Sequence, residues 1–392
     1  MHNDLGWINR AGSVVRDDLH ELAAQWHARP KILNAKSAKP YYSIGQAARL
    51  VGRTPESIRG AEKKNLVKRP ESDEETGRRV GYTLEQINHL RAHFKTFPHR
   101  HPADPPAIIN LYNLSGGVGK SCICTHLAHG LAIDGYRVLV IDASADATTT
   151  AVFDFLPGLD VGYKDTVAPA PAGECDSLAS LVRQTAVDQV DLIPLSYSLS
   201  ADARMFSTSV SERTVTQRVS DQVNKLSADY DVVLIDSASR QDASLVPLLY
   251  TSNAVLVPHP PAGMRVAQTL QSLLILDDRV AACHASGVRL GFNWILGLAN
   301  ESSVKDAEMQ ASWPDNCKVP LRMMRTEIRY NRKIREACDN SSTIFSNAKP
   351  SRSDKTLCNA VSNLWAMTKE TERHIHHIWP IRLAELRAMG HA

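Results

Sequence analysis

The hydrophobic pattern divides the chain into a helical N-terminal part and a part in which strands and helices alternate. From Ala107 onward, short apolar runs recur with helical segments between several of them. The runs that predict buried strands are AIINLYN, RVLVID, VDLIP, YDVVLID, NAVLVP and WILGL. Such alternation is typical of a mostly parallel sheet covered by helices. We therefore expect an α/β domain over residues 107–370.

The first 35 residues predict a helix with a narrow apolar stripe. Val15, Leu19, Leu22 and Trp26 follow a 4-3-4 spacing. Packing on the chain's own domain and a dimer seam both fit this stripe, and its length does not decide between them.

Residues 41–70 predict two short helices joined by a tight turn. Ser43 can cap the first helix and Thr54 the second, which has Pro55 at its first position. Gly52 lies in the turn. This order is typical of a helix-turn-helix, and a hairpin after the pair would form a wing.

Basic residues concentrate on the second of these helices and on the segment after it, before another capped helix from Thr83. Positions of this kind meet the groove and phosphates of DNA. We interpret residues 36–98 as a winged helix-turn-helix, and the alternative is a helical hairpin with a solvated basic face. The residues expected to contact DNA are Arg53, Ser57, Arg59, Lys63, Lys64, Arg78 and Arg79.

Two segments flank the α/β part. Residues 99–106 are rich in proline and histidine and predict a linker. Residues 371–392 predict a terminal helix broken near Pro380, with its histidines on a polar surface.

Composition limits the classes of function. The 392 residues have a net charge of only +3, so any binding of nucleic acid depends on local patches. The seven cysteines form no C-x-x-C pair, which indicates reduced thiols rather than a disulfide framework. Cys122 and Cys124 would point in different directions on a helix, so we expect no shared metal site there. Without a long apolar run or a signal-peptide pattern, we expect a cytoplasmic protein.

The segment NLSGGVGKSC, residues 113–122, has the composition of a phosphate-binding loop between a strand and a helix. Glycine allows the backbone to approach phosphate, Lys120 would neutralise the β- and γ-phosphates, and Ser121 would ligate Mg²⁺. The residues expected to contact the nucleotide are Gly116, Gly117, Val118, Gly119, Lys120, Ser121 and Cys122.

Two further strands end in aspartate. Asp142 ends RVLVID and Asp236 ends YDVVLID, where ligands collect at the edge of an open α/β sheet. We expect Asp236 to join Ser121 at Mg²⁺ and Asp142 to act with Lys120 in catalysis. The threonines at 148–150 follow the second strand, where a nucleotide-sensing switch would lie.

Taken in order, these motifs resemble the ParA partition ATPases, specifically the larger class with an N-terminal DNA-binding domain. The resemblance rests on SIGQAARLVGRTPESIRGAEKKNL, GYTLEQINHLRAHF, NLSGGVGKS, RVLVIDASADATTT and YDVVLIDSAS. It implies a P-loop fold, ATP or ADP with Mg²⁺, a homodimer, DNA segregation on the nucleoid, operon autoregulation and a ParB-like partner. It also implies an adenine site near Pro258 and Pro261, and non-specific DNA contact through Arg329 and Arg332.

The sequence departs from the family at two positions. Ser115 replaces the lysine that reaches the partner's nucleotide, and Ser144 replaces the second aspartate after the strand. Loss of such a charge lowers the rate of ATP hydrolysis by roughly 10²- to 10³-fold. We expect binding of nucleotide with slow hydrolysis; the alternatives are a repressor that does not hydrolyse ATP and a P-loop small-molecule transferase.

Overall fold

The computed structural model describes residues 24, 40–73, 76–144, 146–167, 175–196, 212–238, 246–261, 264–285, 287, 290–302, 321–346 and 354–390. Apart from Ala24, the helix expected over the first 35 residues lies outside this part of the chain.

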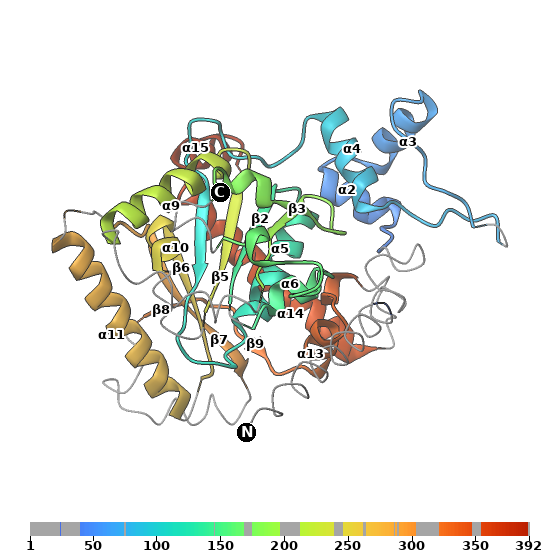
Figure 1. Cartoon of the computed structure of the whole chain (residues 1–392). Helices are drawn as coiled ribbons and strands as arrows, with labels where there is room; N and C mark the ends of the chain where they lie inside the picture. Colours follow the sequence, from blue (N-terminus) through green and yellow to red (C-terminus); the bar gives the residue numbers. More distant parts are fainter. Residues whose placement is uncertain are drawn as a thin grey trace, which may run out of the picture.

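A mostly parallel sheet forms the centre of the larger domain (Figure 1). Among the described residues it has nine strands, in the order β3-β4-β2-β5-β1-β6-β7-β8, with β9 beside β7. Of these, β3 alone runs antiparallel to its neighbour. The strands are β1 (Ala107–Leu111), β2 (Val138–Ala143), β3 (Arg183–Gln184), β4 (Val190–Ile193), β5 (Val232–Ser237), β6 (Ala254–His259), β7 (Trp294–Ser302), β8 (Arg322–Met323) and β9 (Ile328–Arg329).

The expected α/β class is therefore confirmed. Each of the six apolar runs forms a strand, namely β1, β2, β4, β5, β6 and β7. The strands β3, β8 and β9 have two residues each, which is too short to carry a periodic pattern.

Helices cover both faces of the sheet because alternate strand residues point to opposite sides. Ile109 shares a core with residues of α5 and α14, whereas Ile108 shares a core with residues of α9. Figure 1 shows α9, α10 and α11 on one side of the sheet and α5 and α14 on the other. The helices are α5 (Lys120–Asp134), α6 (Thr148–Val152), α9 (Glu212–Ser227), α10 (Val246–Thr251), α11 (Met264–Ala285), α13 (Arg332–Asp339), α14 (Lys355–His376) and α15 (Pro380–Ala388).

The C-terminal helices belong to the core of this domain. The break before Pro380 is confirmed, but the expected boundary at 371 falls inside α14. Trp379, between the two helices, is fully buried with the α5 side of the sheet. The expectation of surface histidines was wrong for His376, which is partly buried and bonds to the Tyr136 hydroxyl at 3.1 Å.

The N-terminal unit has its own small core. Its helices are α2 (Ile44–Val51), α3 (Pro55–Lys63) and α4 (Leu84–Phe94). Buried residues from α2, α3 and α4 form one apolar cluster. Ser72 and Arg79 pair as an antiparallel bridge after α3. The described residues here contain three helices and a turn, and the winged helix-turn-helix remains a prediction.

Arg91 connects this unit to the larger domain. It is 1% exposed and donates to the carbonyl of Ile133, near the end of α5, at 2.6 Å. Gly135 follows, with a φ of +102°, and a Cβ there would lie 2.9 Å from the Arg91 guanidinium. The turn after α5 therefore needs glycine both for its backbone conformation and for the approach of Arg91.

Candidate nucleotide-binding site

The loop between β1 and α5 presents the N-terminus of a helix that has no side-chain cap. Gly119, with a φ of +86°, is the N-cap of α5 and provides no side-chain hydrogen bond. The first N–H groups of a helix need partners and lie at the positive end of its dipole. An anion is the natural partner for such an end.

The start of the loop is held by Asn113. Its amide nitrogen donates to the carbonyl of Pro258 at 3.0 Å, and its oxygen accepts from the N–H of Ser115 at 2.9 Å. Further along, Asn300 of β7 donates to the carbonyl of Val118 at 2.9 Å. A Cβ at Gly119 would collide with this amide, so glycine is required there. The loop thus has a fixed shape.

Lys120 lies inside the loop that it is expected to serve. It is 5% exposed, and its Nζ donates to the carbonyl of Ser115 at 3.1 Å. Burial lowers the pKa of Lys120 to about 8, while Asp236 and Asp146 act in the opposite direction. A phosphate in the loop would supply the negative charge that favours the ammonium form.

The two aspartates meet because of the strand order. Since β5 lies between β1 and β2, Asp236 lies opposite both Leu111 and Asp142. Both carboxyl groups are fully buried. Burial and then the neighbouring Asp236 raise the pKa of Asp142 to about 7, and burial raises the pKa of Asp236.

Hydroxyl groups stabilise this pair. Thr149 donates to Asp236 at 2.8 Å, and the Ser121 hydroxyl opposes the rise in the pKa of Asp236 that burial causes. Thr150 donates to Asp142 at 2.7 Å through its hydroxyl and at 2.8 Å through its N–H. The sequence analysis expected a nucleotide-sensing switch at residues 148–150, but it did not predict that these threonines bond to the two aspartates. Since hydrogen bonds favour the ionised carboxylate, they oppose the effect of burial.

The two departures from the family pattern occupy buried positions. Ser115 is 8% exposed and Ser144 3% exposed. Ser144 donates its N–H to Asp142 at 3.0 Å. Sequence reasoning missed Arg265 of α11, whose guanidinium donates to the carbonyl of Gly117 at 3.2 Å. No local motif marks Arg265, because its contact depends on the packing of α11.

Other expected contacts lie around the same loop. Gly116 and Gly117 are exposed, and Val118 is buried. Cys122 is partly buried in the first turn of α5. Pro258 is inside β6 and Pro261 is buried just after it, so the adenine contact expected of them remains a prediction.

The comparisons with known proteins agree with this geometry. Residues 106–278 match the family model of an AAA domain. Protein SopA of Escherichia coli strain K12 is 31% identical over 245 residues, which are 60% of this chain and 63% of SopA. A solved structure named Partition Protein has a TM-score of 0.64 at 20% identity and covers 94% of this chain and 98% of its own. The Cyanothece McdA(D38A)–ATP complex has a TM-score of 0.53 at 18% identity, over 68% of this chain and 96% of its own.

The chain has a P-loop fold, and its sequence is similar to those of partition proteins. The match spans less than two thirds of SopA. The chain's activity, substrates and partners are therefore treated as proposals below. In the part of the chain that the structure describes, no helix has the length and apolar character needed to cross a membrane.

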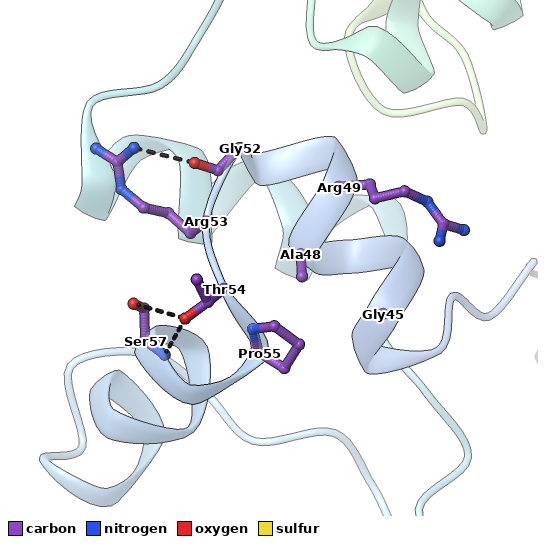
Figure 2. Close-up of a pocket in the computed structure, with 8 residues that line it drawn as sticks. All are labelled: Gly45, Ala48, Arg49, Gly52, Arg53, Thr54, Pro55 and Ser57. Atoms are coloured by element: carbon purple, nitrogen blue, oxygen red, sulfur yellow. Dashed lines mark hydrogen bonds between the residues drawn. The ribbon is translucent and has the colours of Figure 1, made fainter.

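The N-terminal unit of the chain carries an exposed basic surface. Figure 2 shows the hollow between α2 and α3, with Arg49 directed away from it and Arg53 folded back. Arg53 donates to the carbonyls of Gly52 at 3.0 Å and Phe94 at 3.4 Å, and its guanidinium lies over the Phe94 ring. Arg53 thus holds the turn in this conformation.

The remaining residues expected at DNA differ in their surroundings. The side chain of Ser57 contacts the Thr54 hydroxyl at 3.2 Å, and Arg59 lies 3.9 Å from Glu56. Arg79 is bonded to buried Glu62. The exposed cations in the described part of this unit include Lys63, Lys64 and Arg78. Arg49, which sequence reasoning left out, is also exposed.

The segment that contains Arg329 and Arg332 comprises β8, β9 and α13. Arg329 is exposed at the end of β9, and Arg332 is paired with Glu336 at 3.5 Å. Exposed pairs of this kind leave the cations accessible to a stronger anionic partner.

Proposed function

We propose that this chain is a ParA-like partition protein that binds ATP or ADP with Mg²⁺ at residues 113–122. In this proposal it acts in the cytoplasm, as a homodimer on nucleoid DNA, in plasmid or chromosome segregation and in control of its own operon, with a ParB-like partner. The observation that carries the proposal is the uncapped start of α5 with Lys120 inside the loop and two buried aspartates beside it. Free amides, a buried cation and acidic groups together suit a magnesium-bound polyphosphate.

The residues present fit Mg²⁺. The Oδ1 atom of Asp236 is buried and has no hydrogen-bond partner among the described residues. The Ser121 hydroxyl lowers the pKa of the same carboxyl group, against the effect of burial. Oxygen ligands of this kind suit Mg²⁺, which would offset the cost of the buried charge. When bound, the ion would neutralise phosphate charge, while Ser121 and Asp236 hold their oxygens in place.

Hydrolysis is expected to be slow because Ser115 and Ser144 supply neither the positive charge of the family's lysine nor the negative charge of its second aspartate. Ser115 provides no cation at the loop, and Ser144 uses its N–H to orient Asp142. Asp146 is exposed, and its charge acts on Lys120. Arg265 provides a cation at the loop of the same chain. We propose that Asp146 and Arg265 support a residual rate of ATP hydrolysis.

Nucleotide binding is tested with fluorescent mant-ATP and Mg²⁺ on the full chain. Lys120→Ala should weaken binding at least about tenfold, because a charge-assisted contact contributes roughly 1.5–3 kcal/mol. Lys225→Ala, an exposed lysine on α9, is the matched control and should bind as the natural chain does. Equal affinity of the Lys120→Ala and Lys225→Ala variants would contradict the proposed site.

Turnover separates the impaired ATPase from a repressor that does not hydrolyse ATP. The double variant Ser115→Lys with Ser144→Asp should raise the ATPase rate, by up to roughly 10²-fold. Turnover of the natural chain at the rate of the double variant would show that the substitutions are not limiting. Measurable binding without turnover in either protein would favour the repressor.

DNA binding is tested with the segment upstream of the chain's own gene. Lys63→Ala with Lys64→Ala should weaken binding and reduce its salt dependence, since each phosphate contact contributes about 0.9 to the slope of log affinity against log salt. Lys225→Ala again serves as the control. An unchanged slope in the double variant would remove these lysines from the interface.

A further inference from the structure

One face of α5 points toward a distant segment rather than toward the loop. Cys122, His126 and His129 are spaced four and three residues apart, which places them on one side of the helix. This side faces residues 332–346, which comprise α13 and the turn after it.

The two histidines fix that segment against α5. The Nε2 atom of His126 accepts a hydrogen bond from the N–H of Ile344 at 3.0 Å. His129 bonds through Nδ1 to the Thr343 hydroxyl at 2.6 Å. Both rings also contact Phe345 edge-on. Contacts on three successive residues set the distance between α5 and this part of the chain.

Two sulfur atoms meet at one end of this contact. The Sγ atoms of Cys122 and Cys338 lie 3.3 Å apart, although the residues are 216 positions apart in the chain. Both cysteines are partly buried, and neither is in a disulfide. One turn earlier in α13, Arg335 pairs with Glu301 of β7 at 2.9 Å. The sulfur atoms therefore meet beside contacts that hold α13 to β7 and the turn after α13 to α5.

The residue types in this cluster also suit a zinc ion, and their ligand atoms lie within 4.8 Å of one another. The hydrogen bonds of His126 argue against that use. Because Nε2 accepts from Ile344, the ring proton is on Nδ1, which donates to the carbonyl of Cys122 at 2.7 Å. Neither ring nitrogen has a lone pair left for a metal, whereas the two sulfur atoms have only to approach each other.

We infer that Cys122 and Cys338 are an oxidant-sensitive thiol pair, which closes to a disulfide that fastens α13 to the first turn of α5. A disulfide bond is about 2.05 Å long, so the sulfur atoms must approach by roughly 1.3 Å. This inference is independent of the proposed function, because it rests on the thiol pair alone.

The reaction needs an oxidant of the peroxide class. The Cys338 thiolate attacks one peroxide oxygen, the O–O bond breaks, and Cys338 becomes a sulfenic acid while hydroxide leaves. Cys122 then attacks that sulfur as a thiolate and displaces a second hydroxide. The two hydroxides take up the two thiol protons, so two thiols and one hydrogen peroxide give one disulfide and two waters. The hydrogen bond between the two thiols lowers the pKa of Cys338 to about 5, which favours the attacking thiolate.

The test is titration of the reduced full chain with hydrogen peroxide, followed by non-reducing peptide mapping. The expected product is a linked pair of peptides containing Cys122 and Cys338, with a mass two hydrogens below the sum, which forms before any other link. Cys122→Ala and Cys338→Ala should each abolish this product. Cys358→Ala, which removes another partly buried cysteine, should retain it.

Two results would overturn the inference. The first is oxidation of either cysteine to sulfinic acid in the natural chain while the linked peptide is absent. The second is binding of one Co²⁺ by the reduced chain with a thiolate charge-transfer band that is lost in both alanine variants, because the cluster would then be a metal site. Since peptide mapping of the natural chain alone gives the first readout, that test does not depend on the variants folding.

Discussion

Arg79 was expected to contact DNA. In the structure it also neutralises a buried carboxylate, and the effect of this contact on stability can be measured. Glu62 of α3 is 1% exposed. The Arg79 guanidinium donates to both Glu62 oxygens, at 2.9 and 3.2 Å, and the Tyr82 hydroxyl donates at 2.7 Å. Replacement of Arg79 by alanine leaves a buried carboxylate with a single neutral donor.

The magnitude follows from the exposure of the two partners. Removal of one partner from a fully buried pair costs about 3–5 kcal/mol. The Arg79 side chain is 47% exposed, so water screens the pair, and Tyr82 keeps its hydrogen bond. We therefore expect Arg79→Ala to lower the local unfolding free energy by about 1–3 kcal/mol.

The assay is native-state hydrogen exchange of the amides of α3, because it reports local opening in a chain of several units. The expected loss corresponds to exchange about 5 to 150 times faster. The double variant Arg79→Ala with Glu62→Gln removes the buried charge and should restore most of the protection. Exchange in Arg79→Ala within about twofold of the natural chain, or a double variant no better protected than the single one, would refute the reasoning.

The same pair of variants separates structure from recognition. If Arg79 touches DNA, the double variant regains protection but still binds DNA weakly. If its only task is to neutralise Glu62, DNA affinity returns together with protection.

Three further predictions concern the larger domain. Since the pKa of Asp142 is raised to about 7 from an ordinary value near 3.8, its protonated form stabilises the fold, and that stability is lost as pH rises from about 4 through 7. Urea unfolding of nucleotide-free protein should show this fall, and Asp142→Asn should reduce it; equal falls in both proteins would exclude Asp142 as the cause. Trp379 is fully buried and its Nε1 has no hydrogen-bond partner among the described residues, so Trp379→Ala should cost about 3–5 kcal/mol and Trp379→Phe much less. Similar midpoints of thermal unfolding for these two variants would contradict that packing. Arg265→Ala should slow ATP turnover through loss of the cation at Gly117, while Lys225→Ala should not, and equal rates would remove Arg265 from the site.

Local patterns in the sequence were sufficient for the longer strands and for the capped N-terminal helices. Each apolar run between 107 and 298 forms a strand, because a buried parallel strand needs a continuous apolar run and little else. The cap residues Ser43, Thr54 and Thr83 all bond to amides of their helices, as their types and positions predicted. The loop at residues 113–122 was also visible as a candidate site, since its glycines and lysine lie within a few adjacent residues.

Contacts between distant residues were decided only by the tertiary structure. Asp142 and Asp236 meet because β5 lies between β1 and β2, an order that no local pattern encodes. The same holds for Cys122 with Cys338, and for Arg265 with the loop. Arg79 shows the limit most clearly, because a basic residue on a wing has the same local pattern whether it faces DNA or a buried carboxylate. Local sequence fixes backbone conformation and which side chains are apolar, whereas the partner of a charged or reactive group depends on how the whole chain packs.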